Sequence, residues 1–326
     1  MVLLFGGINS CADDENYRTL YEVSNSNSFV GYGLSEFGFA FLAFLSNKIG
    51  LTYELFRTLI SIIGLILLLK TVTEYSNKYN TVFLLYFIYP FMMNVIQIRN
   101  FLAAAIIVYS IRFLIQNSKI GDIKFLIGIL IAFSIHYASI FFIPFIFLKK
   151  YSIKQLIVIS LISVPILCGL TKSNIIPNLI GRIVGEGHMF NLESFFQKGH
   201  WGFILSWIKQ FSIFILCYSA YTIIQKSNLD EKWKILDNII IKLNIFLIII
   251  CFPLMIFNTV YFRLCQDILI LNYIIIGHLL YINPKKGYLY FTFAILLGLC
   301  FLGDEILYDA NFYQVLIPFF QSNSIL

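Results

Sequence analysis

The residues best suited to chemistry are a few polar groups set among long apolar runs. Arg99 stands inside the stretch MMNVIQIRNFLAAAIIVYS, residues 92–110, with Gln97 and Asn100 beside it. Lipid strongly disfavours such a group of side chains, so the pattern indicates a cavity lined by protein. A planar guanidinium donates paired hydrogen bonds to phosphate oxygens, and we expect Arg99 to bind a diphosphate. The alternative is an arginine that extends to the lipid headgroups.

Two other arginines are candidates for contact with the same diphosphate. Arg182 lies in the polar segment 171–200, and Arg263 opens a later apolar run. Asp267 follows Arg263 by four residues, and on a helix this spacing also allows a structural ion pair. The sequence leaves both interpretations of Arg263 open.

Proton transfer needs other side chains, and three residues are candidates. His136, isolated in the apolar segment 125–148, suits a proton donor or acceptor, a phosphate contact, or a histidine bound to a backbone carbonyl at a helix break. Asp14 precedes an aromatic stretch and Glu36 begins an apolar one, so we favour these two carboxylates as the general base. The sequence has no metal-ligand spacing, and we expect neither a metal nor another cofactor.

The composition indicates that these groups belong to a membrane protein. The chain has 326 residues, of which 59% are hydrophobic and 12% charged, and its mean hydropathy is +0.84. Apolar runs of about 17–25 residues, the length that crosses the hydrocarbon layer, recur along the sequence. The expected fold is all-α: a polytopic integral membrane protein with about 9–11 transmembrane or re-entrant helices, in a single transmembrane domain over residues 1–326. The predicted spans lie near 53–70, 81–97, 100–116, 152–170, 203–224, 237–257, 261–281 and 288–303.

Lysines define the orientation that we expect in the membrane. Segments rich in lysine face the cytoplasm, so the acidic or mixed connections 11–22, 171–200 and 303–309 should face outward. The largest extracytoplasmic loop is then 171–200, and Arg99 and Arg263 lie near the outer face. The net charge of +6 reflects this topology and gives no indication of nucleic-acid binding. The lysines behind this assignment are Lys70, Lys78, Lys119, Lys124, Lys149, Lys150, Lys154, Lys226, Lys232, Lys234, Lys242, Lys285 and Lys286.

Some apolar segments are too short to cross a membrane alone. Residues 125–148 have lysines on both sides, which predicts two short helices that meet near His136. Each would contain about 11 residues and rise about 16 Å, so the pair forms a re-entrant or unusually short hairpin. Residues 36–50 are expected to lie along the interface or dip in partway, and residues 1–8 look like the end of a first span.

Four segments in this order resemble the EpsG family of bacterial envelope proteins. They supply an acidic and aromatic stretch, a helix led by Glu36, a helix with Arg99 and Ala103, and a motif around His136. The resemblance covers roughly residues 10–150, and Arg263 is the one later landmark. The segments are DDENYRTLYE (13–22), GYGLSEFGFAFLAFLSNKIG (31–50), YPFMMNVIQIRNFLAAAIIVYSIRFL (89–114) and AFSIHYASIFFIPFIFL (132–148).

The resemblance implies a function, because the EpsG family is grouped with the Wzy-type polysaccharide polymerases. It implies a GT-C-like membrane glycosyltransferase in the bacterial cytoplasmic membrane, with its active site facing outward. Such an enzyme joins undecaprenyl-diphosphate-linked repeat units into O-antigen, capsule or exopolysaccharide. A chain-length regulator is a further candidate partner. The sequence leaves open a glycan ligase, a flippase or transporter of the same lipid-linked sugars, and a membrane acyltransferase, although arginines collected at one face favour surface chemistry over transport.

Overall fold

The computed structural model describes residues 1–8, 11, 13–24, 36–173, 175–176, 178, 202–308, 312–313 and 317–321. These residues form helices and connecting turns, with no strand among them. Among the described residues, six helices are long and apolar enough to cross a membrane, and a pair bent by 45° makes a seventh if it counts as one span. An all-α, polytopic membrane protein is therefore confirmed.

The long helices match the predicted spans closely. Two predicted spans are interrupted: 261–281 is bent, and 81–97 is split into α5 (Tyr79–Ile88) and α6 (Phe91–Ile96). Pro90 stands at this break and has no backbone N–H to continue α5. The six long helices are α4 (Tyr53–Tyr75), α7 (Ile98–Ile111) with its 3-10 extension η1 (Arg112–Gln116), α10 (Ile153–Lys172), α13 (Gly202–Ile224), α14 (Glu231–Phe257) and α17 (Pro284–Tyr308). The bent pair contains η4 (Thr259–Phe262), α15 (Arg263–Asp267) and α16 (Leu269–Ile282).

The chain divides into two compact units. Unit 1 contains Met1–Ile140 and Phe291–Leu326, and unit 2 contains Phe141–Tyr290. The shorter helices are α1 (Val2–Gly7), α2 (Asp14–Val23), α3 (Phe37–Lys48), α8 (Lys119–Ile135), η2 (Tyr137–Phe142), α9 (Phe145–Leu148) and α18 (Ile317–Gln321).

The frame of unit 1 is the parallel pair α4 and α7. Near the start of α4, the Arg57 guanidinium donates to the carbonyl of Val95, just before α7, at 3.0 Å. Near the other end of both helices, Glu74 forms an ion pair with Arg112 at 2.8 Å. Between these contacts, the ring of Phe101 occupies the space that a Cβ on residue 64 would need, so this position requires glycine. Both helices therefore begin at the same end of unit 1.

Helix α8 returns antiparallel to α7. Ser118 caps its start by accepting a hydrogen bond from the N–H of Gly121 at 3.0 Å, so α8 begins at Lys119 and has 17 residues. This first arm is longer than the predicted one, while the second arm consists of the short helices η2 and α9. The helix break near His136 is confirmed, because His136 is the residue at which α8 ends. The end of α8 comes back toward the start of α7.

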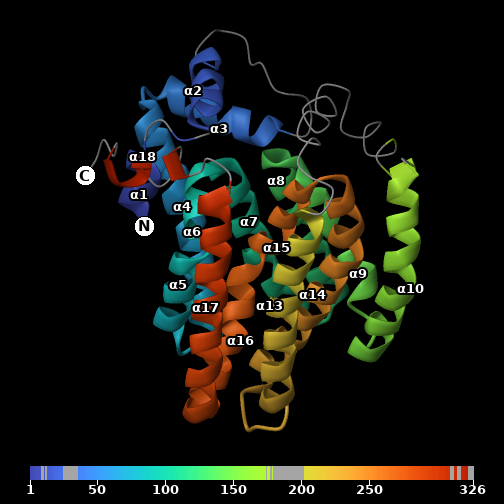
Figure 1. Ribbon diagram of the computed structural model, residues 1–326. Helices are drawn as coiled ribbons and strands as arrows, with labels where there is room; N and C mark the ends of the chain where they lie inside the picture. Colours follow the sequence, from blue (N-terminus) through green and yellow to red (C-terminus); the bar gives the residue numbers. More distant parts are fainter. Residues whose placement is uncertain are drawn as a thin grey trace. The chain divides into compact units, whose positions relative to one another are not determined.

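Helices α2 and α3 gather at the end of unit 1 where α4 begins (Figure 1). The hydroxyl of Tyr21 on α2 donates to the carbonyl of Leu51, just before α4, at 2.6 Å. Helix α3 reaches α8 at Gly38, where Ser134 leaves no room for a Cβ. The segment 36–50 thus contains a helix, as predicted, and its position at a membrane interface stays a prediction.

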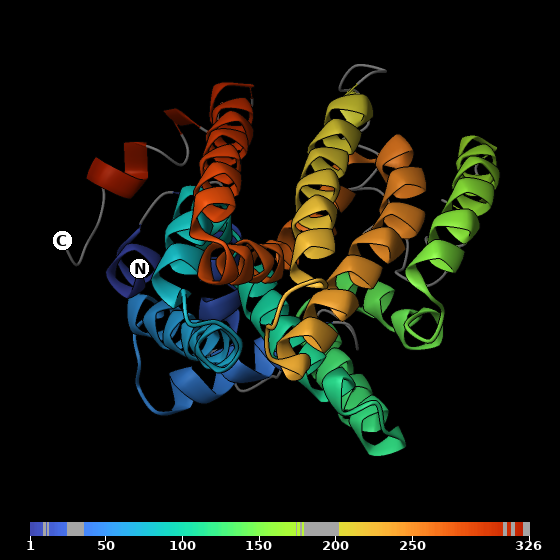
Figure 2. The same ribbon diagram turned by 90° about the horizontal axis from the view of Figure 1, so that it is seen from below.

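Unit 2 is held together by polar contacts inside an apolar helix bundle. Helix α14 lies between α10 and α13 (Figure 2). Asn244 on α14 donates to Asn272 Oδ1 on α16 at 2.6 Å, and Gln210 on α13 donates to Asn244 Oδ1 at 3.2 Å. Amide pairs of this kind join helices where lipid offers no hydrogen bonds.

Candidate active site

Two ion pairs lie at the end of unit 1 where α4 and α7 begin. One joins Asp14 to Arg57, and the other joins Glu36 to Arg99. The sequence selects Asp14, Glu36 and Arg99 as candidate site residues, and the fold brings all three to this end. The two pairs differ in how fully their polar atoms are satisfied.

Arg57 has a hydrogen-bond acceptor at each of its three nitrogens. Its Nη1 donates to Asp14 Oδ1 at 2.7 Å and to the Tyr53 hydroxyl at 3.2 Å. Its Nε donates to the carbonyl of Phe5 at 3.3 Å, and its Nη2 donates to that of Val95 at 3.0 Å. The Arg57 side chain is only 1% exposed, so these contacts compensate for the loss of hydration of its charge. This pair ties α2 and the ends of α1 and α6 to α4.

The Glu36–Arg99 pair is only partly satisfied. Glu36 Oε2 lies 2.8 Å from Arg99 Nη1, and the side chains are 2% and 21% exposed, respectively. The other carboxylate oxygen, Glu36 Oε1, and the Arg99 Nε are both buried without a hydrogen-bond partner among the described residues. Buried polar atoms are normally satisfied, and leaving one unsatisfied costs roughly 1–3 kcal/mol. Two such atoms lie on neighbouring groups of opposite charge, which makes this pair our candidate for a ligand site in unit 1.

Helix α2 contributes to both pairs from consecutive turns. Its first residue is Asp14, the partner of Arg57, and three residues later the Tyr17 ring lies 5.7 Å from the Arg99 guanidinium carbon. A cation near an aromatic ring is attracted by the negative face of the ring. One short helix therefore positions a counter-ion for Arg57 and an aromatic neighbour for Arg99.

The position of Glu36 depends on how α3 meets α8. Glu36 is the residue just before α3, and Gly38 packs directly against the Ser134 side chain near the end of α8. A methyl group at position 38 would collide with the Ser134 hydroxyl. Glycine therefore allows the start of α3, and Glu36 with it, to come close to the end of α8.

His136 lies at this same end of unit 1. It terminates α8, its N–H donates to the carbonyl of Ala132 at 2.8 Å, and its ring contacts that of Tyr137 at 5.0 Å. Because Gly128 of α8 packs against Ser110 of α7, the antiparallel pairing brings His136 to the level of the first turns of α7. The fold thus gathers His136, Asp14, Glu36 and Arg99 at one end of unit 1.

The other two predicted arginines belong elsewhere in the chain. Arg263 begins α15 in unit 2 and is partly exposed, whereas Asp267 at the end of that helix is buried. Among the described residues Arg263 has no ion-pair partner, so the pairing with Asp267 suggested by their spacing is not present. Arg182 and most of the loop 171–200 lie outside the described residues.

Sequence reasoning missed Arg57, Tyr53 and Tyr17 as parts of this region. The sequence does contain a signal for Arg57, since an arginine inside a long apolar helix normally faces a counter-ion within the protein. Tyr53 precedes Arg57 by four residues, the spacing that aligns side chains on one helix face. The sequence gives no indication that Asp14 is the counter-ion, because 43 positions separate them.

Unit 2 has a buried polar cluster of its own. His278 Nδ1 lies 2.9 and 3.0 Å from the two carboxylate oxygens of Asp237, and both side chains are fully buried. The ring of Trp233 stacks on His278 at a centroid distance of 5.0 Å and an angle of 4°. This cluster joins α14 to α16 and contains none of the residues that the sequence selects.

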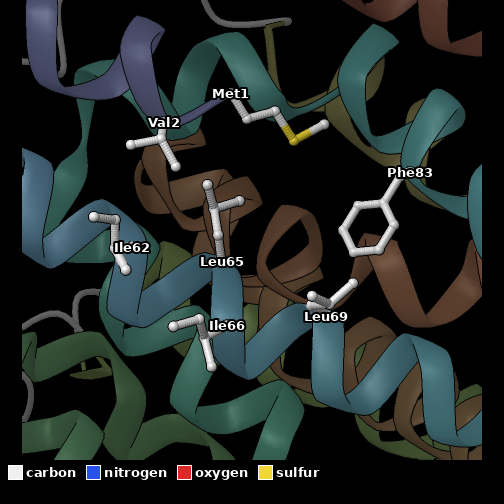
Figure 3. Close-up of a pocket in the computed structure, with 7 residues that line it drawn as sticks. All are labelled: Met1, Val2, Ile62, Leu65, Ile66, Leu69 and Phe83. Carbon is white, nitrogen blue, oxygen red and sulfur yellow. The ribbon is translucent and has the colours of Figure 1, made fainter.

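Unit 1 also contains a hydrophobic pocket of about 270 Å³. It lies beside α4 and α5 at the N-terminus of the chain, and all seven lining side chains are apolar (Figure 3). No side chain in it can transfer a proton or bind a phosphate, so we do not choose this pocket as the candidate for the chemistry. Its lining residues are Met1, Val2, Ile62, Leu65, Ile66, Leu69 and Phe83.

In the described ranges, no three His, Cys, Asp or Glu side chains gather as a metal site. Cys11 lies beside the Asp14–Arg57 pair, with its Sγ 4.0 Å from Arg57 Nη1. Burial raises the pKa of the Cys11 thiol, although the neighbouring guanidinium acts in the opposite direction.

Comparison with known protein families identifies the chain. The profile of the EpsG family matches residues 1–320, which extends the resemblance well beyond residues 10–150. Comparisons with curated proteins and with solved structures find no match, so the expected GT-C-like architecture stays a prediction. The family indicates a polysaccharide-polymerase type of function in a multi-pass membrane protein. With nearly its whole length matched, this chain belongs to the EpsG family.

Proposed function

We propose that this protein is a glycosyltransferase that joins lipid-linked oligosaccharide repeat units into a longer polysaccharide. The carrier is undecaprenyl diphosphate, and the product is O-antigen, capsule or exopolysaccharide. The observation that carries the proposal is the Glu36–Arg99 pair, in which a buried carboxylate oxygen and a guanidinium N–H have no partner among the described residues. A transfer from a lipid diphosphate needs these two kinds of group, a cation for the leaving group and a base for the acceptor.

The reaction is a substitution at the anomeric carbon of the donor glycan. The acceptor hydroxyl oxygen forms a new bond to that carbon, and the bond from carbon to the diphosphate oxygen breaks. The electron pair leaves with the diphosphate, and the hydroxyl proton passes to a base of the protein. Arg99 stabilises the charge that develops on the diphosphate oxygen, and hydrogen bonds of this type contribute roughly 100- to 1,000-fold in rate.

The contacts of Asp14 decide which of the selected residues we propose as the base. Glu36 and His136 are the better candidates for the base, because Asp14 already accepts hydrogen bonds from Arg57 and Tyr53 at 2.7 and 2.8 Å. Arg263 and Arg182 are proposed as further contacts to the lipid diphosphates. Since guanidinium groups supply the positive charge in this scheme, the reaction needs no metal ion.

The orientation of the site follows from the lysines. Lys70, Lys78 and Lys119 lie near the end of α4, between α4 and α5, and at the start of α8, respectively. These positions are at the end of unit 1 opposite Arg99, and the positive-inside rule assigns that end to the cytoplasm. We therefore propose that the Glu36–Arg99 pair faces the outer side of the bacterial cytoplasmic membrane.

Substitution of Arg99 in the native host tests the function. Arg99→Ala is compared with Arg112→Ala, which removes an arginine from the other end of the same helical segment, and envelope glycans are separated on gels. We expect Arg99→Ala to lose long chains while single repeat units are still exported, and Arg112→Ala to keep long chains. Loss of all exported material would indicate a flippase, and long chains that are made but not attached would indicate a ligase. Normal chain length at normal protein level would contradict the proposal.

A further inference from the structure

The carboxylate of Glu36 stands where an anionic ligand of Arg99 would bind. Its Oε2 is 2.8 Å from Arg99 Nη1, which is the distance expected between a guanidinium nitrogen and a phosphate oxygen. Glu36 is the residue immediately before α3, so a small movement of that helix end would separate the Glu36 carboxylate from the Arg99 guanidinium.

The unsatisfied atoms show that Glu36 is an incomplete partner. Arg99 Nε has no acceptor among the described residues, although a guanidinium presents five N–H donors that suit two oxygens at once. A diphosphate offers several oxygens and a greater charge than one carboxylate, so it satisfies donors that Glu36 leaves unpaired. Glu36 Oε1 is likewise without a donor in the described part of the chain. A hydroxyl is the group that would complete it.

From this geometry we infer that Glu36 neutralises Arg99 in the substrate-free protein and is displaced by the substrate diphosphate, which frees it to act as the base. The inference rests on the proposed function and adds an order of events to it. The diphosphate takes over Arg99, the released Glu36 carboxylate accepts the proton of the acceptor hydroxyl, and the acceptor oxygen bonds to the anomeric carbon as the diphosphate leaves. The base is therefore withheld until the donor is bound.

Glu36→Gln tests this exchange with two measurements on the purified full-length protein. Glutamine keeps the size of the side chain but has no charge to neutralise Arg99. We expect inorganic pyrophosphate, measured by calorimetry, to bind the variant about tenfold more tightly than wild type. We expect chain elongation from lipid-linked repeat units to fall about 100-fold or more, because the base is missing.

Glu74→Gln is the matched control. Glu74 pairs with Arg112 at 2.8 Å, the same distance as in the Glu36–Arg99 pair, but at the other end of unit 1. This variant should leave pyrophosphate affinity and elongation unchanged. If Glu36→Gln unfolds the protein, Glu36→Asp keeps the charge but shortens the side chain, and it should bind pyrophosphate more tightly and elongate more slowly than wild type.

The outcomes separate this inference from the proposed function. Wild-type pyrophosphate affinity or wild-type elongation in folded Glu36→Gln overturns the exchange, and so does wild-type behaviour of Glu36→Asp in both measurements. If those results occur while Arg99→Ala abolishes elongation, the proposed function stands and only the role of Glu36 is wrong. If Arg99→Ala elongates normally, the proposed function itself fails.

Discussion

The two ion pairs at one end of unit 1 each join a carboxylate to an arginine, but their structural surroundings differ. In the Asp14–Arg57 pair, the arginine is 1% exposed and each of its three nitrogens has an acceptor. In the Glu36–Arg99 pair, the arginine is 21% exposed, and one atom on each partner is unsatisfied in the described residues. The first pair uses its bonding capacity to hold helices together, whereas the second leaves part of it unused in the described residues, and we propose that a ligand uses that part.

Under the proposed function, the same kind of ion pair has a structural role at Arg57 and a catalytic role at Arg99. A buried arginine with a complete set of acceptors has nothing left to offer a substrate, and removing its counter-ion leaves an uncompensated charge. An arginine with unsatisfied donors is less useful for stability, but a diphosphate can still bind to it. The two pairs therefore carry the same charges but differ in the exposure of the arginine and in how fully its hydrogen bonds are satisfied.

Removal of Arg57 should give the largest effect on stability. Arg57→Ala leaves Asp14 buried beside Tyr53, with Arg18 at 3.9 Å as its remaining cation, and breaking a buried pair in this way costs about 3–5 kcal/mol. We expect a strongly lowered melting temperature in detergent, measured by size-exclusion chromatography after heating. In the Arg112–Glu74 pair, the two side chains are 25% and 30% exposed, respectively. Arg112→Ala should therefore lower the free energy of unfolding by about 1 kcal/mol or less. Equal melting temperatures for the two variants would remove the basis of the comparison.

Neutralisation of Asp14 tests whether this residue is only structural. Asp14→Asn keeps the shape of the side chain but weakens its hydrogen bonds with Arg57, at a cost of about 1.5–3 kcal/mol. The remaining folded protein should elongate glycans at close to the wild-type rate, assayed per mole of monodisperse protein. An inactive but folded Asp14→Asn variant would instead identify Asp14 as the base.

Gly38 provides a graded way to disturb the Glu36–Arg99 pair. Gly38→Ala places a methyl group against Ser134, and overpacking of this kind costs about 1–3 kcal/mol. The start of α3 should shift away from α8 and carry Glu36 with it, so elongation should fall several-fold. Adding Ser134→Ala removes the colliding hydroxyl and should restore much of the activity. A double variant no better than Gly38→Ala would show that this contact does not position Glu36.

Removal of metal ions should have the smallest effect. Because Arg99 supplies the positive charge for the diphosphate in our scheme, excess chelator should change the elongation rate less than about twofold. The assay uses purified protein and lipid-linked repeat units with and without EDTA. Loss of elongation that returns on addition of a divalent cation would show that arginine alone does not serve the leaving group.

Much of the fold could be predicted from the sequence because membrane spans obey a simple length rule. Apolar runs predict most of the long helices, and lysine on both sides of residues 125–148 predicts the helix break at His136. The start of α8 at Lys119 was harder to predict, because it depends on the Ser118 cap rather than on hydropathy. The split of the span 81–97 likewise depends on one residue, Pro90, rather than on hydropathy.

The candidate site could be predicted only in part. Arg99, Glu36, Asp14 and His136 stand out as polar groups among apolar ones, and the fold brings them to one end of unit 1. Their pairing could not be predicted, since Glu36 meets Arg99 and Asp14 meets Arg57 across long separations in the sequence. Such partners depend on how α2 and α3 pack on the long helices, and no local spacing encodes that packing.

Elongation in proteoliposomes tests the central claim most directly. Purified wild type, Arg99→Ala and Arg112→Ala are supplied with lipid-linked repeat units, and product length is followed over time. Our account predicts that Arg99→Ala, while still folded, elongates at least about 100-fold more slowly than wild type, and that Arg112→Ala elongates normally. A folded Arg99→Ala variant that elongates at the wild-type rate would contradict the account.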